Sequence, residues 1–512
     1  MTKLLRILKL IVSRLFVVAL AVIAQVVLIV YFMIQLTSSY IYFQIISSII
    51  GLLVFIMVVN QRMHPEQKII WAFLIIVFPM VGIVLYSVFY INRPSKKHIE
   101  KYTKFHYKGL ESEESYKQEI YKIANQYQDQ VKYIENMSSL NAYKNTQCKY
   151  LKDGKEFYES LIKDLKNAKQ FIFMEYFIIN HGVMWNTILD VLKEKVKEGV
   201  EVKFIYDDLG SAKYVRGNYY KKLRGYGIQC YKYNKMIPLV SSYHNNRDHR
   251  KITVIDGYIG YTGGINLSDE YMNLTHPYGH WKDNAVRLYG PAVNNLTILF
   301  LQNFALASLK TQDYNRYLCD NQKFPKINNN EIIFPYGSGP KSRYYENFAT
   351  DVFLNLIQQA KRSIDISTPY LIIDYATTNA LIAAAARGVK VRILIPSKPD
   401  KKLIYAFSKQ TAYELATYGI EIYTYTPGFN HAKSFLVDDE VAFIGTTNLD
   451  FRSLMHHYEC GVWIYNSPCL KKIDQNFEND YLKSKLMSAN DLKSKFAVKI
   501  IISFLKIFQS LL

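Results

Sequence analysis

Two histidines in this chain, His249 and His431, each stand two residues before a lysine, and they lie 182 residues apart. On a strand, a histidine and a lysine at this spacing project from the same face. That face would carry an imidazole able to attack or protonate and an ammonium able to neutralise an oxyanion. One copy would be weak evidence, but two facing copies would place two imidazoles on opposite sides of one phosphorus. The pattern therefore indicates in-line displacement, in which one histidine attacks phosphorus and the other protonates the leaving oxygen.

The repeat also contains an aspartate seven residues after each histidine, Asp256 in the first copy and Asp438 in the second. Asp256 opens an Asp-Gly hairpin signal between the apolar segments 252–255 and 258–262. Its odd spacing from the histidine places it on the other face of the strand. We therefore count both aspartates in the repeated catalytic motif but expect them to hold the turn and the strand.

Four further polar residues are candidates for supporting the phosphate and the histidines. Asn266 and Asn448 occupy equivalent positions in the two copies and can donate hydrogen bonds to phosphate oxygens. Asp283 and Glu459 follow the histidine of their own half by 34 and 28 residues. We expect each carboxylate to hold the far nitrogen of that histidine, with a plain surface role as the alternative. The two motif lysines, Lys251 and Lys433, meet the charge on the phosphoryl oxygens, so no metal or other cofactor is expected.

Two similar α/β units are expected to position these residues. With 512 residues the chain has room for two full hydrophobic cores. The apolar pattern predicts strands and helices in the same order in both halves. In the first half it predicts a strand at 171–179, a helix at 185–197 and a strand ending at Tyr206. In the second half it predicts a helix at 355–362, a strand at 364–373, a helix at 378–387 and a strand that opens at 388–392. Such an order predicts mixed sheets flanked by helices in two tandem domains.

The chain divides into five predicted segments. They are a membrane anchor at 1–92, a connector at 93–148, two α/β domains at 149–330 and 331–490, and a basic amphipathic helix at 491–512. The anchor contains three apolar runs, at 15–36, 41–59 and 69–91, each long enough to cross a hydrocarbon core of about 30 Å. Two or three transmembrane helices are therefore expected. The terminal helix fits either the lipid headgroup layer or the surface of the chain's own body.

Composition restricts the partners of this chain. Lysine and arginine number 63 against 43 acidic residues, a formal net charge of +20, and half of the residues are hydrophobic. A basic surface suits lipid headgroups or nucleic acid, and the apolar amino-terminal runs favour anionic membrane lipids over nucleic acid. The five cysteines are scattered and have no paired spacing, which argues against a disulfide framework and a zinc site.

The duplicated His-x-Lys-x4-Asp motif resembles that of the phospholipase D superfamily, and other stretches resemble the bacterial cardiolipin synthases within it. These stretches are 60–65, 71–86, 175–176, 206–211, 368–370, 428–433 and 445–453. The resemblance implies two phospholipase D-like domains that transfer a phosphatidyl group from one phosphatidylglycerol to another, giving cardiolipin and glycerol. By the family's usual assignment, His249 is the nucleophile and His431 the general acid and then the base.

The resemblance also implies catalytic domains that face the cytoplasm from a multi-pass anchor, commonly of two helices, whereas this chain has an additional apolar run. The near symmetry of the two motifs leaves the roles of the histidines open on sequence alone. A hydrolase or another phosphatidyl transferase is the alternative within the superfamily. A non-catalytic lipid-binding protein would be expected to have lost one motif, and both are intact here.

Overall fold

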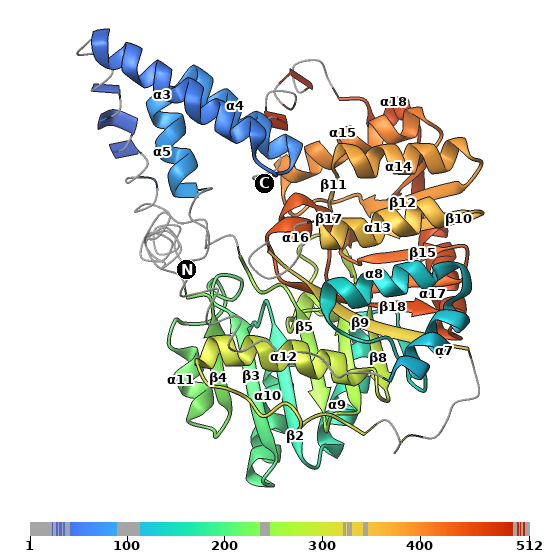
Figure 1. Ribbon diagram of the computed structural model, residues 1–512. Helices are drawn as coiled ribbons and strands as arrows, with labels where there is room; N and C mark the ends of the chain where they lie inside the picture. The colour runs from blue at the N-terminus through green and yellow to red at the C-terminus, as the bar shows by residue number, and fades with distance from the viewer. Residues whose placement is uncertain are drawn as a thin grey trace.

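The computed structural model describes residues 41–89, 113–235, 246–320, 330–340 and 347–494, with isolated positions between 23 and 35, at 324 and between 499 and 506. Two sheet-containing domains lie next to each other, and three helices project from the second (Figure 1). The motif histidines lie in segments that form backbone hydrogen bonds with the other domain.

The first domain is built on a seven-stranded mixed sheet with the order β1-β8-β6-β5-β2-β3-β4. β2, β3 and β4 run parallel, and the other neighbours pair antiparallel. Its strands are β1 Gln147–Leu151, β2 Phe171–Tyr176, β3 Glu201–Asp207, β4 Gln229–Tyr233, β5 Lys251–Ile255, β6 Ile259–Gly263 and β8 Ala285–Tyr289. Its helices are α9 Gly154–Asn167, α10 Val183–Lys197, α11 Tyr219–Arg224 and α12 Val293–Ser308. All six residues of β2 are buried, as expected for a central strand covered by helices on both faces.

The second domain repeats this plan in an eight-stranded sheet with the order β19-β13-β12-β10-β15-β16-β18-β9. Apart from the added edge strand β19, each strand has a counterpart in the first sheet. The strands are β9 Ile332–Ser338, β10 Ser363–Ser367, β12 Lys390–Pro396, β13 Glu421–Tyr425, β15 Ser434–Val437, β16 Val441–Gly445, β18 Glu459–Tyr465 and β19 Ser484–Met487. The helices are α13 Phe348–Gln359, α14 Tyr375–Ala386, α15 Lys402–Thr417, α16 Phe451–Met455, α17 Cys469–Leu482 and α18 Ala489–Leu492. The prediction of two tandem domains with mixed sheets and flanking helices is confirmed.

The predicted strand at 364–373 is wrong as one element. β10 ends at Ser367, and the chain resumes as the short β11 (Leu371–Ile372), which pairs with β17 (Leu449–Asp450) away from the main sheet. Pro369 lies between them and has no N–H to donate to a sheet. This break takes the chain out of the main sheet and into a separate two-stranded pairing.

The end of the predicted connector is part of the second domain's core. α7 (Glu114–Ala124), the 3-10 turn η1 (Asn125–Tyr127) and α8 (Gln128–Ser138) lie against that domain (Figure 1). The buried Gln130 donates to the carbonyl of Val352 at 3.0 Å and accepts from the indole of Trp463 at 3.2 Å. These bonds satisfy a polar side chain inside the core and fix α8 in place.

The predicted span at 69–91 is also wrong as one helix. After α3 (Ile41–Asn60), the structure divides this stretch between two helices, α4 (Pro65–Val77) and α5 (Pro79–Phe89). The break falls at Phe78 because a proline disfavours helical geometry in the residue before it. A side chain at Gly82 would lie 2.6 Å from the backbone of Leu74, so the glycine allows α5 to pack closely on α4.

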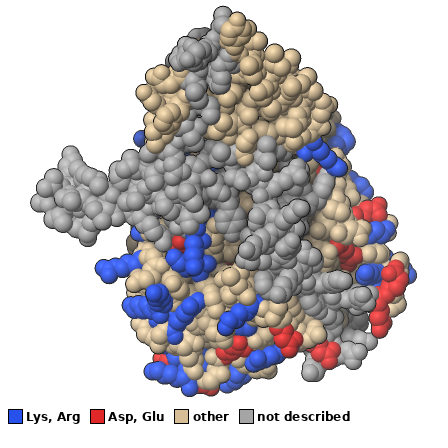
Figure 2. Space-filling model, turned by 60° about the vertical axis from the view of Figure 1, so that its left-hand side comes forward, with Lys and Arg blue, Asp and Glu red and all other residues tan. Residues whose placement is uncertain are grey.

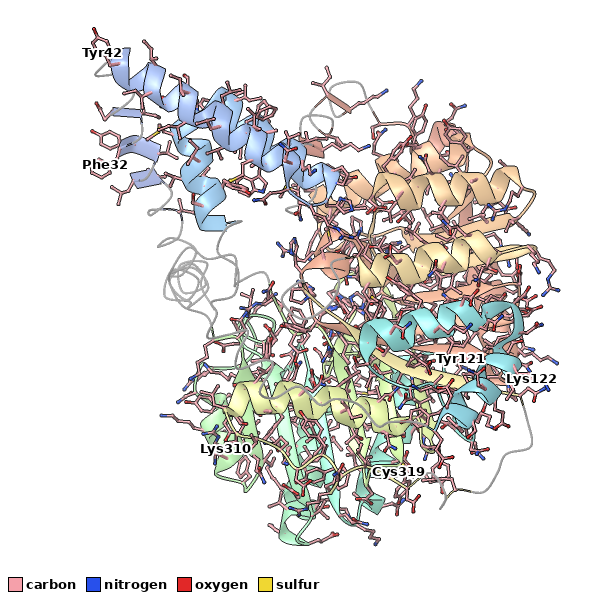
Figure 3. All side chains as sticks on the ribbon, in the orientation of Figure 1. Phe32, Tyr42, Tyr121, Lys122, Lys310 and Cys319 are labelled. Atoms are coloured by element: carbon pink, nitrogen blue, oxygen red, sulfur yellow. The ribbon has the colours of Figure 1, made fainter. Side chains whose placement is uncertain are left out.

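Within the described part of the chain, no helix combines the length and the apolar character needed to cross a membrane. The run at 41–59 forms α3, whereas the run at 15–36 and the predicted helix at 491–512 fall largely outside the described residues. The surface of α3 is nevertheless strongly apolar, and Tyr42 at its far end is 77 % exposed (Figure 3). On the face shown in Figure 2, lysines and arginines gather on the body below this largely uncharged projection.

Candidate active site

The two motif aspartates brace equivalent hairpins. Asp256 and Asp438 both have a positive φ at the turn after the motif strand, β5 or β15. The Asp256 carboxylate accepts hydrogen bonds of 2.7–2.9 Å from the backbone N–H groups of Lys169, Gln170 and Phe171. The Asp438 carboxylate accepts equivalent bonds of 2.6–2.9 Å from Lys361, Arg362 and Ser363. Each aspartate therefore ties a motif hairpin to the start of the neighbouring strand.

Backbone pairing between the domains positions both histidines. His249 donates its N–H to the carbonyl of Tyr458 at 2.9 Å, in the residue just before Glu459. In the same way, His431 donates to the carbonyl of Lys282 at 2.7 Å, in the residue just before Asp283. The second contact continues a parallel pairing between β14 (Gly428–Asn430) and β7 (His280–Lys282). Each domain thus places its carboxylate beside the histidine of the other domain.

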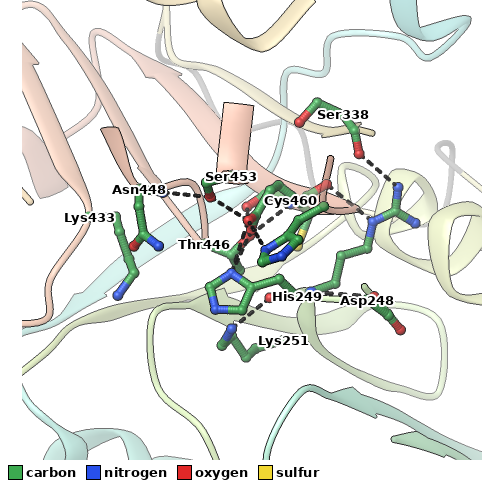
Figure 4. Close-up of polar contacts among 12 residues, drawn as sticks. Asp248, His249, Lys251, Ser338, Lys433, Thr446, Asn448, Ser453 and Cys460 are labelled. Atoms are coloured by element: carbon green, nitrogen blue, oxygen red, sulfur yellow. Dashed lines mark hydrogen bonds and ion pairs between the residues drawn. The ribbon is translucent and has the colours of Figure 1, made fainter. Parts of the chain in front are cut away.

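The carboxylate contacts consequently cross the domain boundary. Nδ1 of His249 lies 2.9 Å from Oε2 of Glu459, and Nδ1 of His431 lies 2.6 Å from Oδ2 of Asp283 (Figure 4 shows the first centre). The expectation that each carboxylate serves the histidine of its own half is wrong. The structural reason is the pairing between domains, which brings together residues more than a hundred positions apart.

The two carboxylates have different surroundings. Glu459 accepts hydrogen bonds from the hydroxyls of Thr446 and Ser453 in addition to its contact with His249. Burial alone would raise the pKa of Glu459, but the charges and hydrogen bonds of His249 and His457 together outweigh burial and lower that pKa. Asp283 accepts from the backbone N–H of Asn284 at 2.8 Å, and burial raises the pKa of Asp283 to about 6, against the opposing charge of Lys433.

Both motif lysines are buried next to their histidines. Nζ of Lys251 donates to the carbonyl of His249 at 2.6 Å. Nζ of Lys433 contacts the carbonyl of His431 and lies 2.8 Å from Nδ1 of the same residue. Burial lowers the pKa of Lys251 to about 8 and that of Lys433 to about 7, although nearby carboxylates oppose it. An anion bound between these lysines would favour their charged forms.

The imidazoles are held neutral. Burial, with a contribution from Lys251, lowers the pKa of His249 to about 3 despite the opposing charge of Glu459. Burial and the charge of Lys433 lower the pKa of His431 well below its ordinary value. A neutral histidine that directs Nδ1 to a carboxylate keeps a lone pair on Nε2. His249 therefore has the form that a nucleophile requires.

Aromatic rings enclose the two imidazoles. Phe177 meets His249 edge-on at 5.0 Å between ring centroids, and Tyr271, Trp281 and Phe429 surround His431 at 5.4–5.7 Å. In these surroundings His249 is 7 % and His431 9 % exposed.

The two motif asparagines differ in their contacts. The amide oxygen of Asn266 accepts from the N–H of Ile178 at 3.0 Å, and its nitrogen donates to the Tyr271 hydroxyl at 2.7 Å. The buried amide oxygen of Asn448 has no hydrogen-bond partner among the described residues. Its backbone N–H donates to the hydroxyl of Ser453 at 2.9 Å. Among the described contacts, the side chain of Asn448 thus makes fewer hydrogen bonds than that of Asn266.

Reasoning from sequence missed three polar neighbours of the first centre: Thr446, Ser453 and His457. The two hydroxyl residues lie in the 445–453 stretch, but nothing in their spacing indicates a contact with Glu459. The ring of His457 lies 5.5 Å from that of His249, and its Nδ1 lies 3.6 Å from Oε1 of Glu459. Ligand atoms of His249, His457 and Glu459 all fall within 4.8 Å of one another, a spacing compatible with a metal. The buried ammonium of Lys251 beside them favours an anion instead.

Comparisons with known proteins agree with this geometry. A family model described as "Cardiolipin synthase, PLD-like domain" matches residues 161–294 and 353–481. The chain is 37 % identical to an uncharacterized protein of Streptococcus mutans, over 89 % of this chain and 98 % of that protein. It is 33 % identical to a cardiolipin synthase of Alkalihalophilus pseudofirmus, over 87 % of this chain and 88 % of the relative. A cardiolipin synthase of Staphylococcus aureus is 32 % identical, over 88 % of this chain and 92 % of the relative.

A solved structure shares the fold. The phosphatidylserine synthase of Haemophilus influenzae superposes with a TM-score of 0.58, covering 77 % of this chain and all of that one, at 14 % identity. At this identity the likeness concerns the fold alone. The two motif-bearing domains and the matched relatives lead to one conclusion: the chain belongs to the cardiolipin synthase family of phospholipase D-like proteins.

Proposed function

We propose that this protein is a cardiolipin synthase, which transfers a phosphatidyl group from one phosphatidylglycerol to another and releases glycerol. The observation that carries the proposal is the pair of buried, neutral imidazoles, each oriented through Nδ1 by a carboxylate of the other domain. This arrangement leaves Nε2 of both residues available for one phosphorus. The names of the relatives indicate the lipid product, cardiolipin.

In the first step, Nε2 of His249 attacks phosphorus. The N–P bond forms, the bond from phosphorus to the glycerol oxygen breaks, and His431 protonates that oxygen as glycerol leaves. His431 needs a proton at this stage, and the negative phosphodiester of the bound lipid favours the protonated ring. In the second step, the now neutral His431 takes a proton from a hydroxyl of a second phosphatidylglycerol. The resulting oxygen attacks phosphorus and the N–P bond breaks.

The different carboxylates favour His249 as the nucleophile. Attack turns its imidazole into a cation, and the fully ionised Glu459 beside Nδ1 stabilises that cation. The partner of His431 is Asp283, whose pKa of about 6 is close to neutrality. A pair that gains and loses protons easily suits the general acid and base.

The lysines and Asn448 complete the phosphate site in this proposal. Lys251 and Lys433 neutralise the charge that builds on the phosphoryl oxygens, and no metal is needed for this purpose. The amide nitrogen of Asn448 donates to one of these oxygens in the proposed complex. Asn266 acts indirectly. Its amide nitrogen donates to the Tyr271 hydroxyl, and the ring of Tyr271 packs against that of His431.

We further propose that helices α3–α5 hold the enzyme at the cell membrane, with the catalytic domains facing the cytoplasm. Exposed apolar side chains cover α3, including Ile45, Ile49, Leu52 and Ile56. Their burial in lipid is favourable at about 25 cal/mol per Å² of apolar surface. The net charge of +20 adds attraction to anionic lipids. The number of membrane crossings stays a prediction from sequence.

Incubation of the purified full-length protein with phosphatidylglycerol liposomes tests the function. Cardiolipin and glycerol in equal amounts are the expected products, detected by mass spectrometry and an enzymatic glycerol assay. Phosphatidic acid without cardiolipin would instead identify a hydrolase. No turnover by the wild-type protein, with the His249→Ala variant as the matched blank, would contradict the proposal.

A further inference from the structure

The first turn of α4 is docked on α16 of the second domain, which lies beside it in Figure 1. His64, the residue that caps α4, meets the ring of Phe451 edge-on at 5.6 Å and 88°. Nε2 of the buried Gln67 lies 4.0 Å from the sulfur of Met455. The contact therefore uses both ends of the five-residue helix α16.

Charged contacts fasten this docking. The His64 ring lies between Glu66 of α4 and Asp374, the residue that caps α14, with Nε2 3.2 Å from Oδ2 of Asp374. Burial alone would lower the pKa of His64, but hydrogen bonds to the two carboxylates outweigh it and raise that pKa to about 9. His64 is therefore an imidazolium at neutral pH. We call the contact of His64, Glu66 and Asp374 the His64 latch.

The other side of α16 faces the catalytic centre. Phe451 and Met455 are four residues apart, so they share one face of the helix, whereas Ser453 lies between them and projects away from that face. The hydroxyl of Ser453 accepts the N–H of Asn448 at 2.9 Å and donates to Oε1 of Glu459 (Figure 4). The carboxylate of Glu459 in turn holds Nδ1 of His249.

Helix α16 is too short to hold this position by itself. Isolated helices of fewer than about 12 residues are marginal in water, and helix stability in proteins comes mainly from packing. Packing against α4 is therefore one of the supports that fix where Ser453 points. A displacement of about 1 Å at a catalytic centre is able to cost about 100-fold in rate.

We propose that the docking of α4 on α16, fastened by the His64 latch, sets the position of Ser453 and thereby the orientation of the Glu459–His249 pair. His64 and Gln67 are then positioning residues for the transfer, although neither contacts the substrate. Catalysis is coupled in this way to the correct position of the apolar helices α3–α5 relative to the second domain. The inference rests on the proposed phosphatidyl transfer as the reaction being measured.

The test compares full-length variants in phosphatidylglycerol liposomes. His64→Ala is expected to lower kcat about tenfold while KM changes less than about twofold, because orientation and not lipid binding is lost. Lys68→Ala, one residue beyond Gln67, is the matched control, since the ammonium of Lys68 donates to the carbonyl of Val59 in α3 and has no described contact with α16. Its kcat is expected to equal that of the wild type.

A double-mutant cycle separates positioning from general destabilisation. Ser453→Ala removes the link to Glu459, so adding His64→Ala to it is expected to cost little further kcat, well short of the product of the two single effects. Three results would each overturn the inference. They are a double variant whose loss of kcat equals the product of the two single losses, an unchanged kcat in His64→Ala, and an effect of His64→Ala confined to KM. If His64→Ala fails to fold, Gln67→Ala, which removes the contact with Met455 instead, replaces it in the same cycle. A wild-type protein that makes no cardiolipin would instead overturn the proposed function.

Discussion

Nδ1 of His249 lies 2.9 Å from Oε2 of Glu459 although the two residues belong to different domains. The reciprocal contact joins His431 to Asp283 at 2.6 Å. Each histidine therefore depends on the opposite domain for its orientation, and the catalytic centre is complete only at the junction.

Glu459→Gln is expected to lower kcat by about 10²- to 10⁴-fold, because the amide no longer stabilises the cation that forms on His249. The fold should survive, since Gln has nearly the same shape. Single-turnover measurements should place the defect in formation of the covalent adduct. Near-wild-type adduct formation in this variant would contradict the cross-domain pairing.

Asp256→Asn and Asp438→Asn are expected to reduce stability by about 1–3 kcal/mol each, since both carboxylates accept three backbone hydrogen bonds. Thermal unfolding of the detergent-solubilised protein measures the effect. The fraction that remains folded should retain kcat. A large fall in kcat without a shift in Tm would show that these aspartates take part in the chemistry.

The pH profile of kcat/KM is expected to fall on the alkaline side. The pKa values of Lys433 and Lys251 are lowered to about 7 and about 8, so the free enzyme loses positive charge as pH rises through this range. Lys433→Arg, which stays charged, should flatten the first part of this fall even if its maximum rate is lower. An alkaline limb unchanged in Lys433→Arg would exclude Lys433 as its origin.

The His64 latch is expected to make stability depend on pH. The folded-state pKa of His64 is about 9 against an ordinary value of 6.5. The stability that it contributes is therefore fully present below pH 6.5 and is lost as pH rises through about 9. The wild type should lose more Tm between pH 6.5 and 9.5 than His64→Gln. Parallel Tm curves for the two proteins would show that the latch is absent.

Local signals made part of this structure predictable. The Asp-Gly pair at Asp256 predicted the hairpin of β5 and β6, because turn geometry is a property of adjacent residues. The duplicated motif predicted two similar domains and the residues that meet between them. The break at Phe78 was missed because hydrophobic length was read without the backbone restriction that Pro79 imposes.

The crossed carboxylates were not predictable from spacing. They depend on backbone pairing between segments far apart in the chain, such as Asp248 with Tyr458. The role of Ser453 was not predictable for the same reason, since its hydroxyl reaches Glu459 only through the packing of α16 in the folded protein. Sequence spacing reports which face of a strand a residue occupies and does not report which domain completes the site.

Identification of the covalent intermediate tests whether His249 is the nucleophile. The protein is mixed with phosphatidylglycerol, quenched in alkaline detergent to preserve the N–P bond, digested and mapped by mass spectrometry. A phosphatidyl adduct is expected on His249 and is absent in His249→Ala, and both His249→Ala and His431→Ala lose cardiolipin formation. An adduct on His431, or full activity in either single variant, would contradict this mechanism.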